Sequence, residues 1–244
     1  DAPTTCYVVV QQNNMSFNYG YSYQGFNNAL FVTPFTEKCF FALNKATQSN
    51  QICLLEGQEG TGKKSILRSL AIETGCTSFH VDASSLCSDT LRSHVLAAVG
   101  CCQWLCFYNI DTLSSALLGE MFRMLTSAQK VLDMARMLDT PGITVLEETE
   151  VQALTCTIDG ISVSMSKKFI QMPIFVTVFD GTTTSKEKLL QHIPHDLLQK
   201  FRPVYCYHHS RHVLLCMLLT YCASKAGVHI PKVLNMARRL EAIR

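Results

Sequence analysis

A glycine-rich stretch with two adjacent lysines carries residue types that bind phosphate. Its residues, Gly57, Gln58, Glu59, Gly60, Thr61, Gly62, Lys63, Lys64 and Ser65, follow the G-x-x-x-x-G-K pattern of a phosphate-binding loop. Glycines let the backbone turn and aim N–H groups at an anion, and a following helix adds partial positive charge at its start. Lys63 is expected to contact the β and γ phosphates. Nucleotide contacts are expected from Gly57, Gly60, Thr61, Gly62, Lys63, Lys64 and Ser65.

The residue after this lysine departs from the pattern. Phosphate-binding loops place Ser or Thr there, and its hydroxyl ligates Mg²⁺. Lys64 has no hydroxyl and brings a positive charge to the place of the metal ion. We therefore expect a loop that holds phosphate but no Mg²⁺, with part of the missing metal charge supplied by Lys64. The alternative is a glycine-rich strand-to-helix turn without any ligand.

The elements around the loop must place it at an edge of a sheet. Residues 52–55 form an apolar run that predicts a buried strand, and the apolar residues 66, 67, 70 and 71 have helical spacing. Further strands are predicted at 78–82, 103–108, 174–178 and 204–207, and helices at 37–47, 90–99, 113–138, 212–224 and 232–243. This alternation predicts an α/β fold, a parallel sheet covered by helices on both faces, with ligands at the carboxyl ends of the strands.

Several local patterns refine this arrangement. Residues 7–10 predict an N-terminal strand, and Thr36 is expected to cap the helix at 37–47. Two alternating runs, 154–158 and 161–165, flank Asp159-Gly160 and predict a β-hairpin inserted into the α/β alternation. Asp111 is expected to act as the N-cap of the long helix that follows.

Composition excludes several classes of protein. The 244 residues are 48% hydrophobic with a net charge of +2, so no basic surplus indicates nucleic-acid binding. The longest apolar run, 213–219, is far too short to cross a membrane. The chain begins at Asp1, without a leader pattern, and we expect it to be a piece of a longer protein.

Twelve cysteines are expected to be reduced core residues in an intracellular protein, because many lie in apolar runs. One cluster has the density of a metal site: Cys206, His208, His209, His212 and Cys216. It lacks the paired C-x-x-C spacing of structural zinc sites. We favour a strand-to-helix junction there and expect no metal.

Several motifs, in their order along the chain, resemble the first AAA+ module of a dynein heavy chain. Residues 19–25, Tyr-Gly-Tyr-Ser-Tyr-Gln-Gly, are similar to the family's Tyr-Gly-Tyr-Glu-Tyr-Leu-Gly. Residues 31–39 are similar to Val-Ile-Thr-Pro-Leu-Thr-Asp-Arg-Cys, and 57–64 to Gly-Pro-Ala-Gly-Thr-Gly-Lys-Thr. Residues 104–110 align with Trp-Ala-Cys-Phe-Asp-Glu-Phe, and 200–204 with Leu-Phe-Arg-Pro-Val. The resemblance covers residues 7–240.

The departures from this family fall on its chemical groups. The family's Mg²⁺-organising Asp is Tyr108 here, and its water-polarising Glu is Asn109. The sensor Asn that holds the γ-phosphate is Phe179. Together with Lys64, these positions leave no catalytic residues for hydrolysis. The resemblance still implies an adenine pocket at Val32 and Pro34, and a module-boundary arginine at Arg202, for which a salt bridge at a helix end is the alternative.

The resemblance implies a five-stranded parallel sheet sandwiched by helices, a hairpin insertion and a small C-terminal helical subdomain. Residues 1–25 would end a preceding linker, 26–208 form the large subdomain and 209–244 begin the small one. The implied function is a hydrolysis-deficient ring scaffold, compatible with bound ATP or ADP, without Mg²⁺. Its partners would be neighbouring AAA+ modules and subunits of dynein-type or axonemal complexes, in the cytoplasm, cytoskeleton or a ciliary axoneme. The alternatives are an active motor ATPase module and an unrelated phosphate-binding-loop module for GTP, although no Asn-Lys-x-Asp run is present.

Overall fold

The structure is a computed structural model that describes residues 8–23, 25, 30–101, 103–138, 153–158, 160–166, 174–178 and 199–227. The chain divides into two compact units, Asp1–Cys206 and Tyr207–Arg244. None of the helices in these described stretches combines the length and apolar character that a membrane crossing requires. The predicted helix at 232–243 and Phe179 lie outside the described residues.

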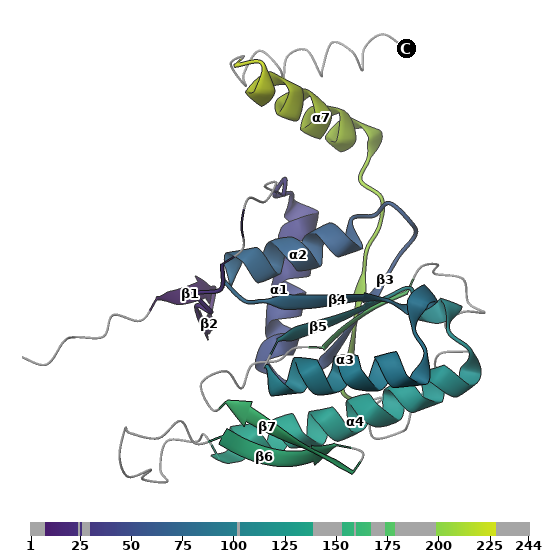
Figure 1. The fold of residues 1–244 in the computed structure, drawn as a ribbon. Coiled ribbons are helices and arrows are strands. Elements are labelled where there is room, and N and C mark those ends of the chain that lie inside the picture. Colours follow the sequence, from purple (N-terminus) through teal and green to yellow (C-terminus); the bar gives the residue numbers. More distant parts are fainter. Residues whose placement is uncertain are drawn as a thin grey trace, which may run out of the picture. The chain divides into compact units, whose positions relative to one another are not determined.

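A five-stranded parallel sheet forms the centre of the first unit (Figure 1). Its strands are β3 (Ile52–Glu56), β4 (Ser78–Asp82), β5 (Trp104–Tyr108), β8 (Ile174–Val178) and β9 (Phe201–Tyr205). They lie in the order β4-β5-β8-β3-β9, and every neighbouring pair is parallel. The predicted parallel sheet is confirmed. The connections from β3 to β4 and from β4 to β5 each pass through a helix, as parallel neighbours require.

Helices cover both faces of this sheet. The helices α1 (Pro34–Gln48) and α2 (Lys63–Glu73) cover one face, and α3 (Ser88–Gly100) and α4 (Ser115–Leu138) the other (Figure 1). Strand β5 illustrates the division, because Leu105 and Phe107 pack with α3 and α4. Its alternate residues Trp104, Cys106 and Tyr108 pack with α1 and α2. Burial on both faces explains why β3 and β5 are almost continuously apolar instead of alternating.

Two antiparallel hairpins accompany the sheet. One joins β1 (Val9–Gln12) and β2 (Met15–Asn18), and the other joins β6 (Ala153–Ile158) and β7 (Ile161–Ser166). The β6–β7 hairpin lies beside α3 and α4 (Figure 1) and confirms the predicted insertion. The second unit contains α7 (Arg211–Lys225), whose N-cap Ser210 accepts a hydrogen bond from the backbone N–H of Val213.

The first helix begins earlier than predicted. Thr33, not Thr36, is the N-cap of α1, so the expected cap at Thr36 was wrong. The two threonines bond reciprocally: the N–H of Thr36 donates to Thr33 Oγ1 at 3.2 Å, and the N–H of Thr33 donates to Thr36 Oγ1 at 2.7 Å. Pro34 occupies the first helical position, where its missing N–H costs nothing. A threonine therefore serves in place of the usual Glu at the third position of this capping box.

One further expectation was wrong, and another was right in kind but displaced along the chain. Asp111 does not cap the long helix, because it lies in a short 3-10 helix, Ile110–Thr112, and α4 begins only at Ser115. The N-terminal strand begins at Val9 and turns at residues 13–14 into β2, which the sequence did not predict. Strand β2 is short and mixes polar with apolar residues, and only Met15 and Phe17 are buried.

The N-terminal segment is fixed to the end of α2 by two glycines. The N–H of Gly20 donates to Thr74 O at 2.9 Å, and that of Ser22 to Gly75 O at 2.8 Å. A Cβ on Gly20 would lie 2.4 Å from Gly75 O, and one on Gly75 would lie 2.4 Å from the ring of Tyr19. Only glycine at both positions permits this approach. The hairpin of β1 and β2 thus enters the body of the fold at the carboxyl end of α2.

Candidate nucleotide-binding site

The phosphate-binding loop joins the carboxyl end of β3 to the start of α2. Gly62 is the N-cap of α2 and has a φ of 85°, a backbone conformation that side chains disfavour. A Cβ on Gly57 would lie 2.1 Å from the carbonyl oxygen of Cys206, which follows β9. Glycine is therefore required at one end of the loop for close approach and at the other for its backbone conformation. The loop leads directly into a helix N-terminus, which favours an anion.

Lys63 is buried inside the loop. Its Nζ donates to the carbonyl oxygen of Gln58 at 2.7 Å and also to that of Gly57. Burial lowers the pKa of Lys63, while the nearby Cys206, Asp111 and Glu59 act in the opposite direction. Carbonyl dipoles are weaker partners for an ammonium than phosphate oxygens are. The geometry is that of a lysine held in the loop, within reach of an anion that would replace the carbonyl contacts.

Lys64 points to the neighbouring strands instead. Its Nζ lies 3.5 Å from Asp82 Oδ2 and 4.7 Å from the ring centroid of Tyr108. Asp82 ends β4 and pairs in register with Tyr108 at the end of β5. Burial raises the pKa of Asp82, but hydrogen bonds from Ser84 and the charge of Lys64 outweigh it, and the net direction is downward. An ammonium, a carboxylate and an aromatic ring thus meet beside the loop.

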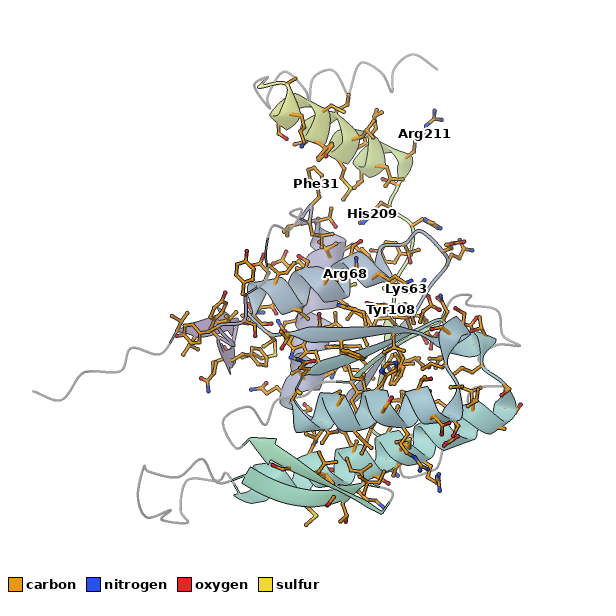
Figure 2. The ribbon with its side chains drawn as sticks, viewed as in Figure 1. Phe31, Lys63, Arg68, Tyr108, His209 and Arg211 are labelled. Atoms are coloured by element: carbon orange, nitrogen blue, oxygen red, sulfur yellow. The ribbon has the colours of Figure 1, made fainter. Side chains whose placement is uncertain are left out.

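Tyr108 is a packing residue with one polar contact. Its ring is buried and lies parallel to that of His80, with the centroids 5.6 Å apart. Its hydroxyl lies 2.5 Å from His80 Nδ1, and His80 Nε2 lies 2.7 Å from Ser78 Oγ. Burial lowers the pKa of His80 to about 4, with Arg68 and Lys64 contributing, so this imidazole is neutral at physiological pH. Burial also raises the pKa of Tyr108. Figure 2 labels Lys63, Arg68 and Tyr108 between α2 and the sheet.

Asn109 takes an unusual backbone conformation. Its φ is 55°, in the left-handed region, which Asn tolerates better than most residues. Its N–H donates to Thr177 Oγ1 of β8 at 3.2 Å, and its side-chain Nδ2 lies 3.5 Å from Asp82 Oδ2. Asn109 thus directs its side-chain amide donor toward the carboxylate of Asp82.

These groups fit a polyphosphate better than they fit Mg²⁺. The glycine loop, the start of α2 and Lys63 form an arrangement for phosphate oxygens, and Gly57 permits the close approach to Cys206 that the loop needs. Mg²⁺ demands several oxygen ligands in octahedral geometry. Around Lys64, the carboxylate of Asp82 faces an ammonium and an amide donor. A nucleotide would supply phosphate charge here, and Lys63 and Lys64 would neutralise part of it.

The remaining predicted site residues lie in different places. Ser65 and Pro34 are exposed, and Val32 is 72% exposed just before α1. Arg202 is half-buried near the amino end of β9, paired with Cys53, and therefore away from the phosphate-binding loop at the other end of the strand. Among the residues that the structure describes, no three His, Cys, Asp or Glu side chains gather as metal ligands. Within α7, the sulfur atom of Cys216 lies 3.6 Å from His212 Nε2.

Three residues of the site were not predicted: Asp82, His80 and Thr177. The last residue of a predicted strand, Asp82, lies at the sheet edge where ligands were expected, so its position was a usable signal. No such signal marks His80, because its contact with the Tyr108 hydroxyl depends on how two separate strands pair. Thr177 is buried and bonds the backbone of Asn109 across the sheet.

Comparison with known proteins shows the family of this chain. The family described as the hydrolytic ATP binding site of dynein motor region matches residues 19–234. Dynein axonemal heavy chain 14 of Homo sapiens is 41% identical over 66 residues, 27% of this chain and 2% of that protein. A cytoplasmic dynein heavy chain of Paramecium tetraurelia is 26% identical over 200 residues, 80% of this chain and 4% of that protein.

A third relative is the Dynein-1-alpha heavy chain of the flagellar inner arm I1 complex of Chlamydomonas reinhardtii. It is 26% identical over 127 residues, 51% of this chain and 3% of that protein. The chain therefore spans only 2–4% of the length of these relatives. The family match covers most of the chain and includes the phosphate-binding loop, the sheet and the helices on both its faces. The chain belongs to the dynein family, in the AAA+ region described as its hydrolytic ATP-binding site.

Proposed function

We propose that this chain is a hydrolysis-deficient AAA+ module that binds ATP or ADP without Mg²⁺. The observation that carries the proposal is the position of Lys64, with its Nζ 3.5 Å from Asp82 and 4.7 Å from the ring of Tyr108. In the family, the residues at positions 64 and 108 hold the metal. An ammonium over an aromatic ring repels a divalent cation and offers it no oxygen ligand. Loss of a positioned general base alone typically slows a reaction by ~10²- to 10⁴-fold.

We further propose that the module serves as a scaffold within a ring of AAA+ modules. Its partners would be the neighbouring modules of the same longer chain and subunits of dynein-type or axonemal complexes. The relatives are named as axonemal, cytoplasmic and flagellar inner arm heavy chains. On this basis we place the protein in the cytoplasm and cytoskeleton, including a ciliary axoneme. In this scheme residues 1–25 end a linker, 26–208 are the large subdomain and 209–244 begin the small one.

One observation favours a second candidate, an active motor ATPase module. Asp82 supplies a carboxylate one strand away from the position where the family has its own. If Lys64 moved toward bound phosphates, Asp82 would be released to hold a metal ion or to polarise water. This candidate predicts turnover that depends on both Lys63 and Asp82.

Phosphate release under steady-state conditions distinguishes the two candidates. The chain should release no phosphate above the level of a Lys63→Ala variant, which lacks the phosphate-contacting ammonium. The same measurement on the full-length protein shows whether other modules supply activity. Turnover that disappears in both Lys63→Ala and Asp82→Asn would overturn the proposal and establish the motor alternative.

A further inference from the structure

A histidine and a cysteine lie against each other on α7. His212 and Cys216 are four residues apart, so they occupy the same side of the helix, one turn from each other. The sulfur atom of Cys216 lies 3.6 Å from His212 Nε2, and both residues are half-buried. Two side chains that can ligate a metal ion thus converge at a place that solvent reaches in part.

The structure selects this pair from the five Cys and His residues that are clustered here in the sequence. Cys206 is buried in the first unit, beside the phosphate-binding loop. His208 is exposed and His209 is half-buried, in the segment that leads to α7. Among the residues with a described position, no third His, Cys, Asp or Glu completes a cluster with His212 and Cys216. The candidate site is therefore a two-residue clamp within one helix.

The separation of the two ligand atoms fits a bound zinc ion. In tetrahedral zinc sites the Zn–S distance is about 2.3 Å and the Zn–N distance about 2.0–2.1 Å, which places sulfur and nitrogen about 3.5 Å apart. The observed 3.6 Å between Cys216 and His212 therefore requires almost no movement of either side chain. A thiolate and an imidazole are also ligands that suit Zn²⁺, whereas Mg²⁺ prefers oxygen. Geometry and ligand type both favour zinc.

We propose that His212 and Cys216 bind one Zn²⁺ ion and thereby link the first two turns of α7. His212 binds through Nε2 of its neutral ring, and the Cys216 thiol releases its proton to the solvent as its sulfur binds the metal. Water fills the two remaining positions of the tetrahedron. With two of the usual four ligands, we expect a dissociation constant of about 1–100 µM, weaker than in structural zinc sites.

Cys222 provides a matched control on the same helix. It is exposed, and no histidine or carboxylate lies one turn before or after it in the sequence. Trypsin cleaves after Arg211 and Lys225, so Cys216 and Cys222 lie in one peptide, residues 212–225. Fragment ions of this peptide report the modification of each thiol in the same sample. A difference between the two cysteines therefore reflects their surroundings on α7.

Protection from alkylation tests the clamp in the intact chain. The chain is treated with iodoacetamide in buffered Zn²⁺, in Mg²⁺, or with a chelator alone. At a free Zn²⁺ concentration of about ten times the dissociation constant, about one molecule in eleven has an unbound Cys216, so its alkylation should slow about tenfold. The rate at Cys222 should change by less than about twofold, and Mg²⁺ should protect neither thiol.

Substitutions at His212 identify the second ligand. His212→Ala should abolish the protection of Cys216, and His212→Cys should restore it, because a thiolate then replaces the imidazole one turn away. The restoring variant keeps the test decisive even where His212→Ala disturbs the helix. Cys222→Ser should leave the protection of Cys216 unchanged. The proposal is overturned if Zn²⁺ protects Cys216 and Cys222 equally, if Cys216 stays unprotected at about 1 mM Zn²⁺, if protection persists in His212→Ala, or if His212→Cys is not protected.

Discussion

Lys64 Nζ and Asp82 Oδ2 lie 3.5 Å apart, across the gap between α2 and the end of β4. Both side chains are substantially exposed, at 51% and 40%, so the pair contributes little to the stability of the fold. Its importance is positional. It places a tethered positive charge beside the phosphate-binding loop, and it pairs with the carboxylate at this edge of the sheet.

Nucleotide binding should be nearly independent of Mg²⁺. Titration calorimetry should give ATP affinities within about threefold with and without a chelator, because the described residues near Lys64 offer a metal few oxygen ligands. Lys63→Ala should weaken binding by about 10- to 100-fold through the loss of charge-assisted hydrogen bonds. Lys130→Ala, an exposed lysine on α4, is the matched control and should have no effect. A large loss of affinity on chelation would mean that another group holds the metal.

Restoring the family residues should create Mg²⁺-dependent nucleotide binding and lower the stability of the fold. The variant Lys64→Thr, Tyr108→Asp, Asn109→Glu and Phe179→Asn should bind Mg-ATP in a metal-dependent manner. Without ligand it should unfold more easily, because the buried Tyr108 packs on His80 and its loss costs about 3–5 kcal/mol. Glu at position 109 must also adopt the left-handed backbone of Asn109, at about 1–2 kcal/mol.

Thermal melts with and without Mg-ATP measure both the loss of stability and the gain in binding. Mg-ATP should raise the melting temperature of the variant more than that of the original chain, since a ligand that binds only the folded state stabilises it. The single variant Tyr108→Phe is the control, because it keeps the ring and removes only the hydroxyl. A quadruple variant as stable as the original would mean that Tyr108 does not fill the site.

Acid should destabilise the fold through His80. Its pKa falls from an ordinary 6.5 to about 4 on folding, so between these values the unfolded chain binds more protons than the native one. The free energy of unfolding therefore rises with pH across this window and falls as the solution is acidified. Urea midpoints at about pH 5 should be lower than at about pH 7.5, and the drop should be smaller in His80→Gln. An NMR titration that finds the His80 pKa near 6.5 would contradict this account.

Gly57→Ala should be strongly destabilising. A methyl group there meets Cys206 O at 2.1 Å, so either the loop or the end of β9 must move. We expect a loss of about 2–4 kcal/mol or an insoluble product. Gly119→Ala in α4 is the matched control, because nothing lies within 4 Å of its Cβ. In a helix that change should stabilise by about 0.5–1 kcal/mol, which a chemical denaturation curve can resolve.

The sequence predicted the sheet and the loop because both have local signatures: continuous apolar strands, and glycines at fixed spacing before Lys63. It misplaced the start of α1, because Thr33 and Thr36 are both competent caps and only the position of Pro34 decides between them. His80 was missed as a site residue because its contact with Tyr108 depends on the register between separate strands, whereas the position of Asp82 at the end of a predicted strand was a local signal. The roles assigned to Phe179 and Arg202 remain predictions.

The attachment of the N-terminal segment to α2 couples the movement of this helix to that of the segment. The helix has 11 residues, and its first residue is Lys63 of the phosphate-binding loop, while Thr74 and Gly75, just beyond its last, hold Gly20 and Ser22. At 1.5 Å per residue it is a stiff lever about 16 Å long. A tilt of about 10° around the phosphate end would move the other end by about 3 Å. Because the backbones at Gly20 and Gly75 are in close contact, the hairpin of β1 and β2 would move with the helix.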